Sequence, residues 1–340
     1  MTTMRAAQLV DYGKPIEIRE IVTPTPGPGE VLVRIGGSGA CHSDLHIISG
    51  ELRMLPTLPW TLGHENAGWV AAVGVGVTGL DIDTPVAVFG GWGCGKCRLC
   101  LSGEEQLCNT MTWGGIGSPG GYAEYMIVPA ARHLITLKSL DPATAAPLTD
   151  AGLTPYHAVR QALPRLLPGT TAVVIGVGGL GHFGLQFVRE LSPARIVAID
   201  TSKEKRALAL ELGADVALDP TTDDVASEVK RGGEGAAAVF DFVGAATTLE
   251  LAASLVGRQG MVVLVGLAGG SLPYSFMGMP GESVVMGSTW GTHNELEEVL
   301  TLASTGRLSF HFEQHPLEKI NEIFHRLEHG EILGRAVIVP

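Results

Sequence analysis

Four of the five cysteines lie within fifteen residues of one another, a density that points to metal binding. Their spacing is C-x2-C-x2-C-x7-C, with thiols at Cys94, Cys97, Cys100 and Cys108. Thiolates held together by glycine-rich turns suit a closed tetrahedral zinc site, in which protein fills every coordination position. Free thiols are one alternative. An iron–sulfur cluster is another, although the bacterial ferredoxin motif has a shorter last spacing and a following proline. The spacing therefore predicts a structural zinc with no open position for a substrate.

The fifth cysteine, Cys41, is a candidate ligand for a different kind of site. It lies in the segment GSGACHSDLH, and His64 lies in TLGHENAG; each is at a glycine-flanked turn near an acidic residue, Asp44 or Glu65. A carboxylate that hydrogen-bonds a metal-binding histidine fixes its tautomer and raises its basicity. A catalytic zinc needs three protein ligands and one open position, and spacing alone does not identify the third ligand. A small core cysteine and a structural histidine are the alternative interpretation.

A third motif is a glycine-rich turn after an apolar segment. It has the pattern G-x-G-x-x-G and consists of Gly176, Val177, Gly178, Gly179, Leu180 and Gly181. In such a motif the glycines make the turn, admit a pyrophosphate and let a helix pack closely, while the helix N-terminus attracts phosphate. A second apolar segment ends at Asp200, nineteen residues after Gly181. A carboxylate there binds the ribose hydroxyls and favours NAD over NADP. Lys205 is a further ribose candidate and equally a helix-surface lysine. A turn without nucleotide is the alternative for the whole motif.

The elements that must position these residues follow two patterns. In the first third, strands are interrupted by glycine and proline, and we expect strands at 31–35, 64–77 and 121–128 and a loop at 90–120. From about residue 152, apolar strands alternate with helices, which predicts a parallel, doubly wound sheet. The predicted strands are 171–176, 194–200, 236–244, 260–266 and 334–340, and the predicted helices are 179–191, 202–214 and 293–305.

Composition limits the classes of function. The chain has 340 residues, of which 45% are hydrophobic and 17% charged, and its formal net charge is −12. This much apolar surface excludes disorder, and the negative charge argues against nucleic acid or an anionic membrane as the main partner. We find neither the apolar region of a signal peptide nor a run long enough to span a membrane. We therefore expect a cytoplasmic protein, in which clustered thiols hold metal more often than they form disulfides.

These motifs together resemble the zinc-dependent medium-chain alcohol dehydrogenases over essentially the whole chain. That family's zinc signature fits Gly63, His64, Glu65, Gly68, Gly74 and Val77. Three further motifs occur in the same order along the chain as in the family: CHSDLH at 41–46, the four cysteines and GVGGLG. The resemblance implies an α/β fold with two domains. A GroES-like, mostly-β catalytic domain would comprise 1–151 and 291–340, and a Rossmann domain would comprise 152–290. It also implies NAD(H) and two zinc ions per subunit, one catalytic and one structural.

The resemblance assigns roles to individual residues. It implies that Cys41, His64 and Asp150 hold the catalytic zinc, that Glu65 is a nearby or alternate ligand, and that Asp44 orients His64.

The implied reaction is reversible hydride transfer between NAD(H) and an alcohol whose pKa the zinc lowers. Ser43 would take the proton from the alcohol oxygen, and His46 would pass it to solvent through the nicotinamide ribose. Further implied cofactor contacts are His42 and Arg335 near the pyrophosphate, and Thr154, Val265 and Leu267 near the nicotinamide. Val243 is another candidate for cofactor binding.

The third zinc ligand departs from the best-known family members, which have cysteine where this chain has Asp150. Several bacterial secondary-alcohol dehydrogenases have aspartate there, which favours secondary alcohols and ketones as substrates. The alternatives are a polyol dehydrogenase, a formaldehyde-type aldehyde dehydrogenase of the same family, and a non-enzymatic dinucleotide-binding relative. Trp92 and Trp290 are candidates for the substrate pocket, with a core or interface position as the alternative. We expect a small-molecule substrate and a homo-oligomer, with a tetramer favoured and a dimer open.

Overall fold

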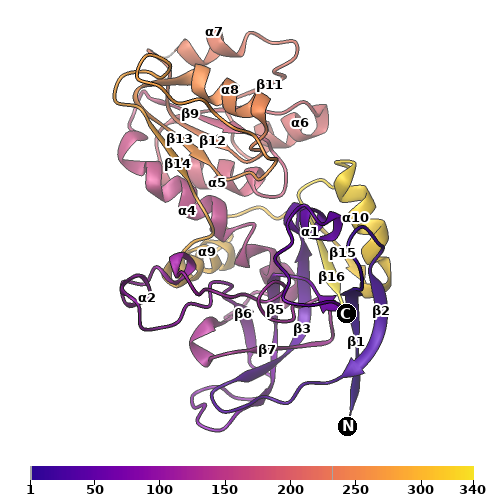
Figure 1. The fold of residues 1–340 in the computed structure, drawn as a ribbon. Coiled ribbons are helices and arrows are strands. Elements are labelled where there is room, and N and C mark those ends of the chain that lie inside the picture. Colours follow the sequence, from indigo (N-terminus) through magenta and orange to yellow (C-terminus); the bar gives the residue numbers. More distant parts are fainter. Residues whose placement is uncertain (1, 232) are drawn as a thin grey trace. The chain divides into compact units, whose positions relative to one another are not determined.

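The computed structural model of the chain describes residues 2–231 and 233–340, which form two units (Figure 1). The first unit contains the chain up to Leu153 together with Gly291–Gly306 and Phe310–Pro340. The second contains Thr154–Trp290 and Arg307–Ser309. The chain therefore leaves the first unit after its N-terminal part and returns to it near the C-terminus.

The first unit is built on two sheets. The larger sheet has the strand order β15 (Phe312–Pro316), β16 (Arg335–Val339), β3 (Val31–Ala40), β5 (Glu65–Val73), β6 (Pro85–Val88) and β8 (Leu134–Thr136), with β7 (Tyr125–Val128) also paired to β3. The smaller sheet has the order β2 (Glu17–Val22), β1 (Thr3–Leu9) and β4 (Trp60–Thr61). The alternating Val31, Val33 and Ile35 of β3 are buried and pack with Val70 of β5 and Val86 of β6. The period-two pattern in the sequence is thus the inward face of the central strand.

Short helices connect these strands. They are α1 (His42–Ser49), α2 (Arg98–Leu101), α3 (Pro142–Ala145), α9 (His293–Ser304) and α10 (Ile320–Glu328), with single turns η1 (Glu105–Leu107), η2 (Ala131–His133), η3 (Ala146–Thr149) and η5 (Leu317–Lys319). The segment predicted as a loop at 90–120 contains α2 and η1. Helix α1 directly follows the central strand β3, so that Cys41 stands between the two.

The second unit is a six-stranded parallel sheet. Its strand order is β11 (Val216–Leu218), β10 (Arg195–Ile199), β9 (Thr171–Ile175), β12 (Ala236–Asp241), β13 (Val256–Leu264) and β14 (Val284–Gly287). Its helices are α4 (Leu153–Ala162), α5 (Gly181–Leu191), α6 (Lys203–Glu211), α7 (Val225–Lys230) and α8 (Ala246–Leu255), with one turn, η4 (Leu163–Arg165). Every residue of β9 is buried, as expected for a strand covered on both faces. The predicted doubly wound α/β fold is confirmed.

From β9 the chain adds β10 and β11 on one side, and then β12, β13 and β14 on the other side. The direction in which strands are added therefore changes at β9. In open parallel sheets, ligands bind beyond the carboxyl ends of the strands at such a reversal. The glycine-rich turn at 176–181 follows β9 and leads into α5, so it lies at this point. Among the described helices, none combines the length and apolar character needed to cross a membrane.

Candidate active site

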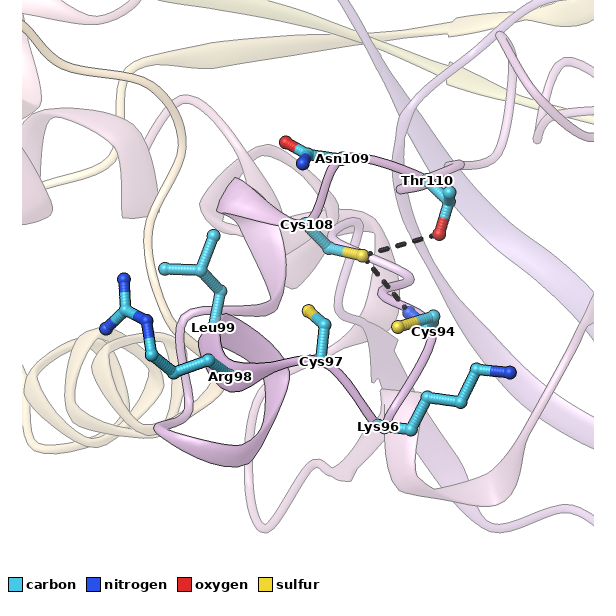
Figure 2. Close-up of a pocket in the computed structure, with 8 residues that line it drawn as sticks. All are labelled: Cys94, Lys96, Cys97, Arg98, Leu99, Cys108, Asn109 and Thr110. Atoms are coloured by element: carbon cyan, nitrogen blue, oxygen red, sulfur yellow. Dashed lines mark hydrogen bonds between the residues drawn. The ribbon is translucent and has the colours of Figure 1, made fainter.

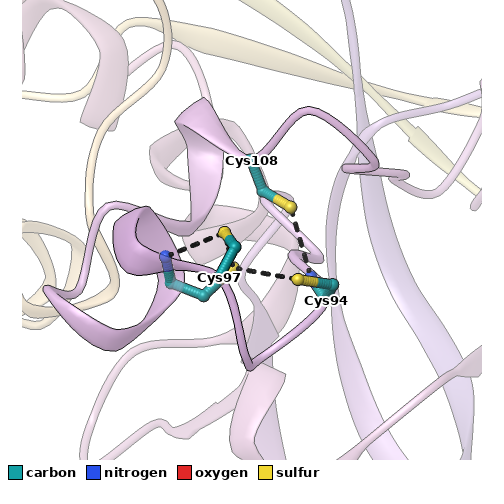
Figure 3. Close-up of side chains that lie close together, drawn as sticks. Cys94, Cys97 and Cys108 are labelled. Carbon is teal, nitrogen blue, oxygen red and sulfur yellow. Dashed lines mark hydrogen bonds between the residues drawn. The ribbon is translucent and has the colours of Figure 1, made fainter.

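The four clustered thiols converge in a lobe of the first unit, here defined as residues 91–113. Figure 2 shows three of them, Cys94, Cys97 and Cys108. Their sulfur atoms all lie within 4.8 Å of one another. The Cys97 and Cys100 sulfurs are 3.5 Å apart, and those of Cys94 and Cys100 are 3.9 Å apart. Figure 3 labels the three cysteines of the group other than Cys100, namely Cys94, Cys97 and Cys108. Four thiolates bound tetrahedrally to zinc at about 2.3 Å would lie about 3.8 Å from each other. The lobe therefore fits a structural zinc, as its spacing predicts.

Backbone groups of the lobe hold the sulfurs in place. The Cys94 N–H donates to the Cys108 sulfur at 3.4 Å, and the Cys100 N–H donates to the Cys97 sulfur at 3.5 Å. The Cys94 N–H and the Thr110 hydroxyl lower the pKa of the Cys108 thiol to about 6. Burial and the neighbouring Cys97 raise the pKa of Cys100 to about 12. Four adjacent thiols disfavour one another's ionisation, and a bound cation would allow all four to be thiolates.

The second constellation also converges in the first unit. Donor atoms of Cys41, His64, Glu65 and Asp150 all lie within 4.8 Å of one another. Strands β3 and β5 are neighbours in the sheet, and they bring the turn at Cys41 beside His64 and Glu65. Asp150 directly follows η3, which packs against β5 and β3. One thiolate, one imidazole and carboxylate oxygens are the ligand types that zinc takes in catalytic sites.

His64 is held between two carboxylates. Its Nδ1 lies 3.4 Å from Asp44 Oδ1, and its Nε2 lies 3.5 Å from Asp150 Oδ2. The other oxygen of Asp44 accepts hydrogen bonds from the Cys41 N–H at 3.1 Å and from the Tyr122 hydroxyl at 2.7 Å. Burial lowers the pKa of His64, but Asp44 and Asp150 outweigh it and raise the pKa well above 6.5. The orientation of His64 by Asp44 stays a prediction, and the 3.4 Å contact is compatible with it.

A buried ion pair lies beside these ligands. Arg335 and Glu65 are 2% and 0% exposed, and the guanidinium reaches both carboxylate oxygens, with Nε 3.1 Å from Oε2. Gly39 lies opposite Glu65 in the β3–β5 register, where a side chain would collide with Glu65 Oε2. Burial raises the pKa of Cys41, but Arg335 and His64 outweigh it and lower the pKa from 9.0 to about 7. Burial raises the pKa of the Glu65 carboxyl, and the charge of the Arg335 guanidinium lowers it.

The structure gives Arg335 a partner that the sequence did not predict. The resemblance puts this side chain at the pyrophosphate, which stays a prediction, and in the structure its guanidinium pairs with Glu65. The cause is the pairing of β16 with β3, which carries Arg335 into the buried interior next to β5. The contact joins residues 270 positions apart, and no local pattern predicts it.

The predicted relay residues lie on the helix that starts at Cys41. The Cys41 sulfur and the Ser43 hydroxyl are 3.6 Å apart. His46 lies one helical turn after Ser43, and its Nδ1 is 2.6 Å from Oε2 of Glu51. Sequence reasoning missed Glu51; the only available signal was the glycine before it, which ends α1. His42, expected near the pyrophosphate, is exposed.

The glycine-rich turn of the second unit has the form that a dinucleotide requires. Gly176 has a φ of 84°, a side chain at Gly178 would meet nothing within 4 Å, and a side chain at Gly181 would collide with the Gly176 carbonyl. Asp200 Oδ2 accepts a hydrogen bond from the Val177 N–H at 2.8 Å. The bare backbone and the adjacent carboxylate therefore fit the pyrophosphate and the adenosine ribose of NAD.

The other cofactor candidates of the second unit range from buried to exposed. Val243 flanks Gly176, Val265 is 8% exposed, and Leu267 is 62% exposed. Thr154 is 6% exposed, and Lys205 is half-buried in the first turn of α6. Sequence reasoning missed Asp241, which is fully buried: its Oδ1 accepts the N–H groups of Val243 and Gly244, and its Oδ2 accepts the Thr248 hydroxyl. Asp241 thereby shapes the turn after β12.

The two tryptophan candidates are both buried. Trp92 is 3% exposed, packs with Val88 and Met126 in the core of the larger sheet, and donates its indole N–H to the Phe89 carbonyl at 2.6 Å. This packing matches the core alternative, and a place for Trp92 in the substrate pocket stays a prediction. Trp290 is 7% exposed and has a φ of 50°.

Comparison with known proteins gives consistent matches over nearly the whole chain. The alcohol dehydrogenase GroES-like domain matches residues 27–139, and the zinc-binding dehydrogenase domain matches residues 179–305. An NAD-dependent alcohol dehydrogenase of Sulfurisphaera tokodaii is 38% identical over 99% of this chain and 100% of its own length. D-arabinose 1-dehydrogenase (NADP+) of Saccharolobus solfataricus is 36% identical over 100% of this chain and 99% of its own.

Solved structures of similar fold are also dehydrogenases or reductases that match nearly the whole chain. The alcohol dehydrogenase of the hyperthermophilic archaeon Aeropyrum pernix has a TM-score of 0.93 and 39% identity, covering 99% of this chain and 100% of its own. Acetophenone reductase of Geotrichum candidum, solved with NAD, has a TM-score of 0.89 and 34% identity, covering 99% and 97%.

Proposed function

The chain belongs to the zinc-dependent alcohol dehydrogenase family, and we propose that it transfers hydride reversibly between NAD(H) and a secondary alcohol or ketone. The observation that carries the proposal is the convergence of Cys41, His64 and Asp150 within 4.8 Å, with the Ser43 hydroxyl 3.6 Å from the Cys41 sulfur. When bound, zinc would supply the Lewis acidity that lowers the pKa of an alcohol, and NAD would supply the hydride acceptor. The chain's own residues must therefore hold these groups and move one proton.

We assign the catalytic metal to Cys41, His64 and Asp150, and the structural metal to the four cysteines of the lobe. Glu65 lies close enough to the first group to serve as an alternate ligand, but its pairing with Arg335 favours a supporting role. Asp44 fixes the orientation of His64. Ser43 takes the proton of the alcohol, and His46 carries it toward solvent.

The dinucleotide is assigned to the turn at 176–181 and to Asp200. The Asp200 carboxylate is fixed by the N–H groups of Val177 and Ser202, at 2.8 Å and 2.9 Å. A fixed carboxylate at the end of β10 accepts ribose hydroxyls and repels a 2′-phosphate, which favours NAD. Because one similar protein is named as NADP-dependent, the test of function must compare NAD with NADP.

The substrate class is tested by kcat/KM over a panel with NAD and NADP. The panel contains secondary alcohols of graded size, primary alcohols, polyols, D-arabinose and formaldehyde. We expect secondary alcohols with NAD to give the highest values, in keeping with the ketone named for the acetophenone reductase. Preference for D-arabinose or a polyol would establish the alternative instead, and no turnover with any member would favour the non-enzymatic relative.

We also propose that the chain forms a homo-oligomer, with a tetramer favoured. Strand β14 is the end strand of its sheet, and the segment before it exposes Tyr274, Phe276 and Met277 at 62%, 95% and 88%. Sheet edges and apolar patches of this kind are normally covered. Analytical ultracentrifugation should show a tetramer, and Phe276→Glu should shift it to smaller species; a wild-type monomer would contradict the proposal. The five free thiols favour a reducing compartment such as the cytoplasm.

A further inference from the structure

Helix α1 ends in a turn that places an acidic side chain against the relay histidine. Gly50 has a φ of 83°, and its N–H donates to the Ile47 carbonyl at 3.0 Å. The Leu52 N–H donates back to the His46 carbonyl at 3.0 Å. The chain therefore reverses at Gly50, and Glu51 returns beside the last turn of the helix. Residues five apart do not face each other on a continuous helix, so this contact depends on the cap.

The contact fixes which nitrogen of His46 carries a hydrogen. Nδ1 lies 2.6 Å from Glu51 Oε2. An ionised carboxylate only accepts hydrogen bonds, so Nδ1 must be the donor, and in the neutral ring Nε2 then holds the free lone pair. Within the described part of the chain, Nε2 makes no hydrogen bond. His46 is thus held in the tautomer that accepts a proton at Nε2.

The two side chains differ in exposure, with Glu51 closer to solvent than His46. The His46 side chain is 27% exposed, whereas that of Glu51 is 68% exposed. Ser43 lies three residues before His46, on the same face of α1. The hydroxyl, the imidazole and the carboxylate therefore form a series that runs from the Cys41 sulfur to the surface. An exposed pair of this kind contributes little to stability, so its effect is to be sought in the reaction.

We propose that Glu51 is a positioning residue for proton transfer, holding His46 with Nε2 ready to accept and stabilising the imidazolium that forms. The inference rests on the Ser43–His46 relay of the proposed function. One proton leaves the alcohol oxygen by way of Ser43 and arrives at Nε2, which gives an imidazolium with hydrogen on both nitrogens. One proton then passes to water, and the neutral ring returns to the form in which Nδ1–H is bound to Glu51.

The test uses Glu51→Gln, which keeps the size of the side chain. The glutamine amide can both donate and accept a hydrogen bond, so it can bind His46 Nδ1 with or without its hydrogen. We expect kcat for alcohol oxidation to fall about tenfold, which is part of the roughly hundredfold or more that a positioned proton-transfer group contributes. The NADH dissociation constant should stay within about twofold. In protein labelled with 15N-histidine, the His46 signal, identified by its loss in His46→Gln, should shift away from the Nδ1–H form. Glu51→Asp should recover part of the rate.

Two further variants separate the possible failures. Glu20→Gln removes an exposed carboxylate from β2 and should leave kcat and the His46 signal unchanged. Combining Glu51→Gln with His46→Gln should add no further loss, because Glu51 acts through His46. If His46→Gln alone leaves kcat unchanged, the relay itself fails. If His46→Gln slows turnover but Glu51→Gln changes neither the rate nor the tautomer, or slows the His46→Gln enzyme equally, only the role of Glu51 is overturned.

Discussion

The two metal constellations lie in the same unit of the fold but are built in different ways. The lobe draws four thiols from residues 94–108, and neighbouring backbone N–H groups hold the sulfurs. The second site draws on residues 41, 64, 65 and 150, which only the β3–β5 pairing and η3 bring together. A closed site of like ligands can be encoded by a short loop. A site of mixed ligands with room for a substrate requires the tertiary fold.

The surroundings of the two sites also differ in charge. In the lobe, Cys94 is exposed and Cys97 half-buried. The second site lies against the buried Glu65–Arg335 pair and the buried Asp44. Buried charges are costly unless each has its partner. The second site should therefore be sensitive to distant single changes, whereas the lobe should respond mainly to loss of its own ligands.

The largest expected effect comes from Cys41→Ser. Loss of this thiolate removes a ligand of the catalytic metal, so turnover should fall by at least about a thousandfold. The turn at 176–181 and Asp200 belong to the second unit, so NADH binding, measured by fluorescence titration, should persist.

Cys94→Ser is the matched control for that change. It removes an exposed thiol of the lobe, and turnover of the freshly folded protein should stay within about tenfold of wild type, because a closed structural site does not contact the substrate. Wild-type turnover in Cys41→Ser would remove the catalytic role of the second site.

The next largest effect concerns Arg335→Met. Removing the guanidinium leaves Glu65 buried and unpaired, which should lower the free energy of unfolding by about 3–5 kcal/mol in urea titrations at pH 7.5. The double change with Glu65→Gln should lose less than the single change.

The control for this comparison is Arg5→Met, which removes a half-buried arginine that contacts Glu124 and Glu318. It should cost no more than about 1 kcal/mol. Equal losses from Arg335→Met and Arg5→Met would show that the second site does not depend on its buried pair.

The smallest expected effect is a pH dependence next to the lobe. His133 is 2% exposed and stacks near Phe89 and Trp92, and burial lowers its pKa from 6.5 to about 3. As pH falls below 6.5 the unfolded chain binds this proton first, so stability is lost between pH 6.5 and pH 3. At pH 5 the loss from this group is about 2 kcal/mol.

His133→Phe should therefore lose less stability than wild type between pH 7 and pH 5, as measured by urea unfolding at both values. The exposed His325→Gln on α10 serves as the control and should follow the wild-type profile. Parallel losses in wild type and His133→Phe would exclude His133 as the source.

Sequence patterns predicted the local parts of the molecule well. Apolar runs and helical periods gave β9, α5 and β10 to within a few residues, because burial on both faces leaves a continuous signal. The four cysteines and the glycine-rich turn were found because their chemistry depends on short spacings. The short strands β11 and β14 were missed, since three or four residues carry too little pattern.

What the sequence did not predict depends on tertiary contacts or on special backbone conformation. Asp150 could be named only through a family resemblance, because no spacing relates it to Cys41. The Arg335–Glu65 pair joins positions 270 apart. The His46–Glu51 contact needs the left-handed conformation of Gly50. Trp92 is close in sequence to the lobe, but its side chain packs against β-strands of the larger sheet, a contact that the sequence does not show.

The central claim is that one chain holds two independent metal sites, one closed and local, the other open and assembled by the fold. Zinc content per chain, measured by mass spectrometry on wild type, Cys41→Ser and Cys100→Ser after removal of loosely bound metal, tests it most directly. We predict about two zinc ions for wild type and about one for each variant. One zinc in wild type, or two retained in Cys41→Ser, would contradict it.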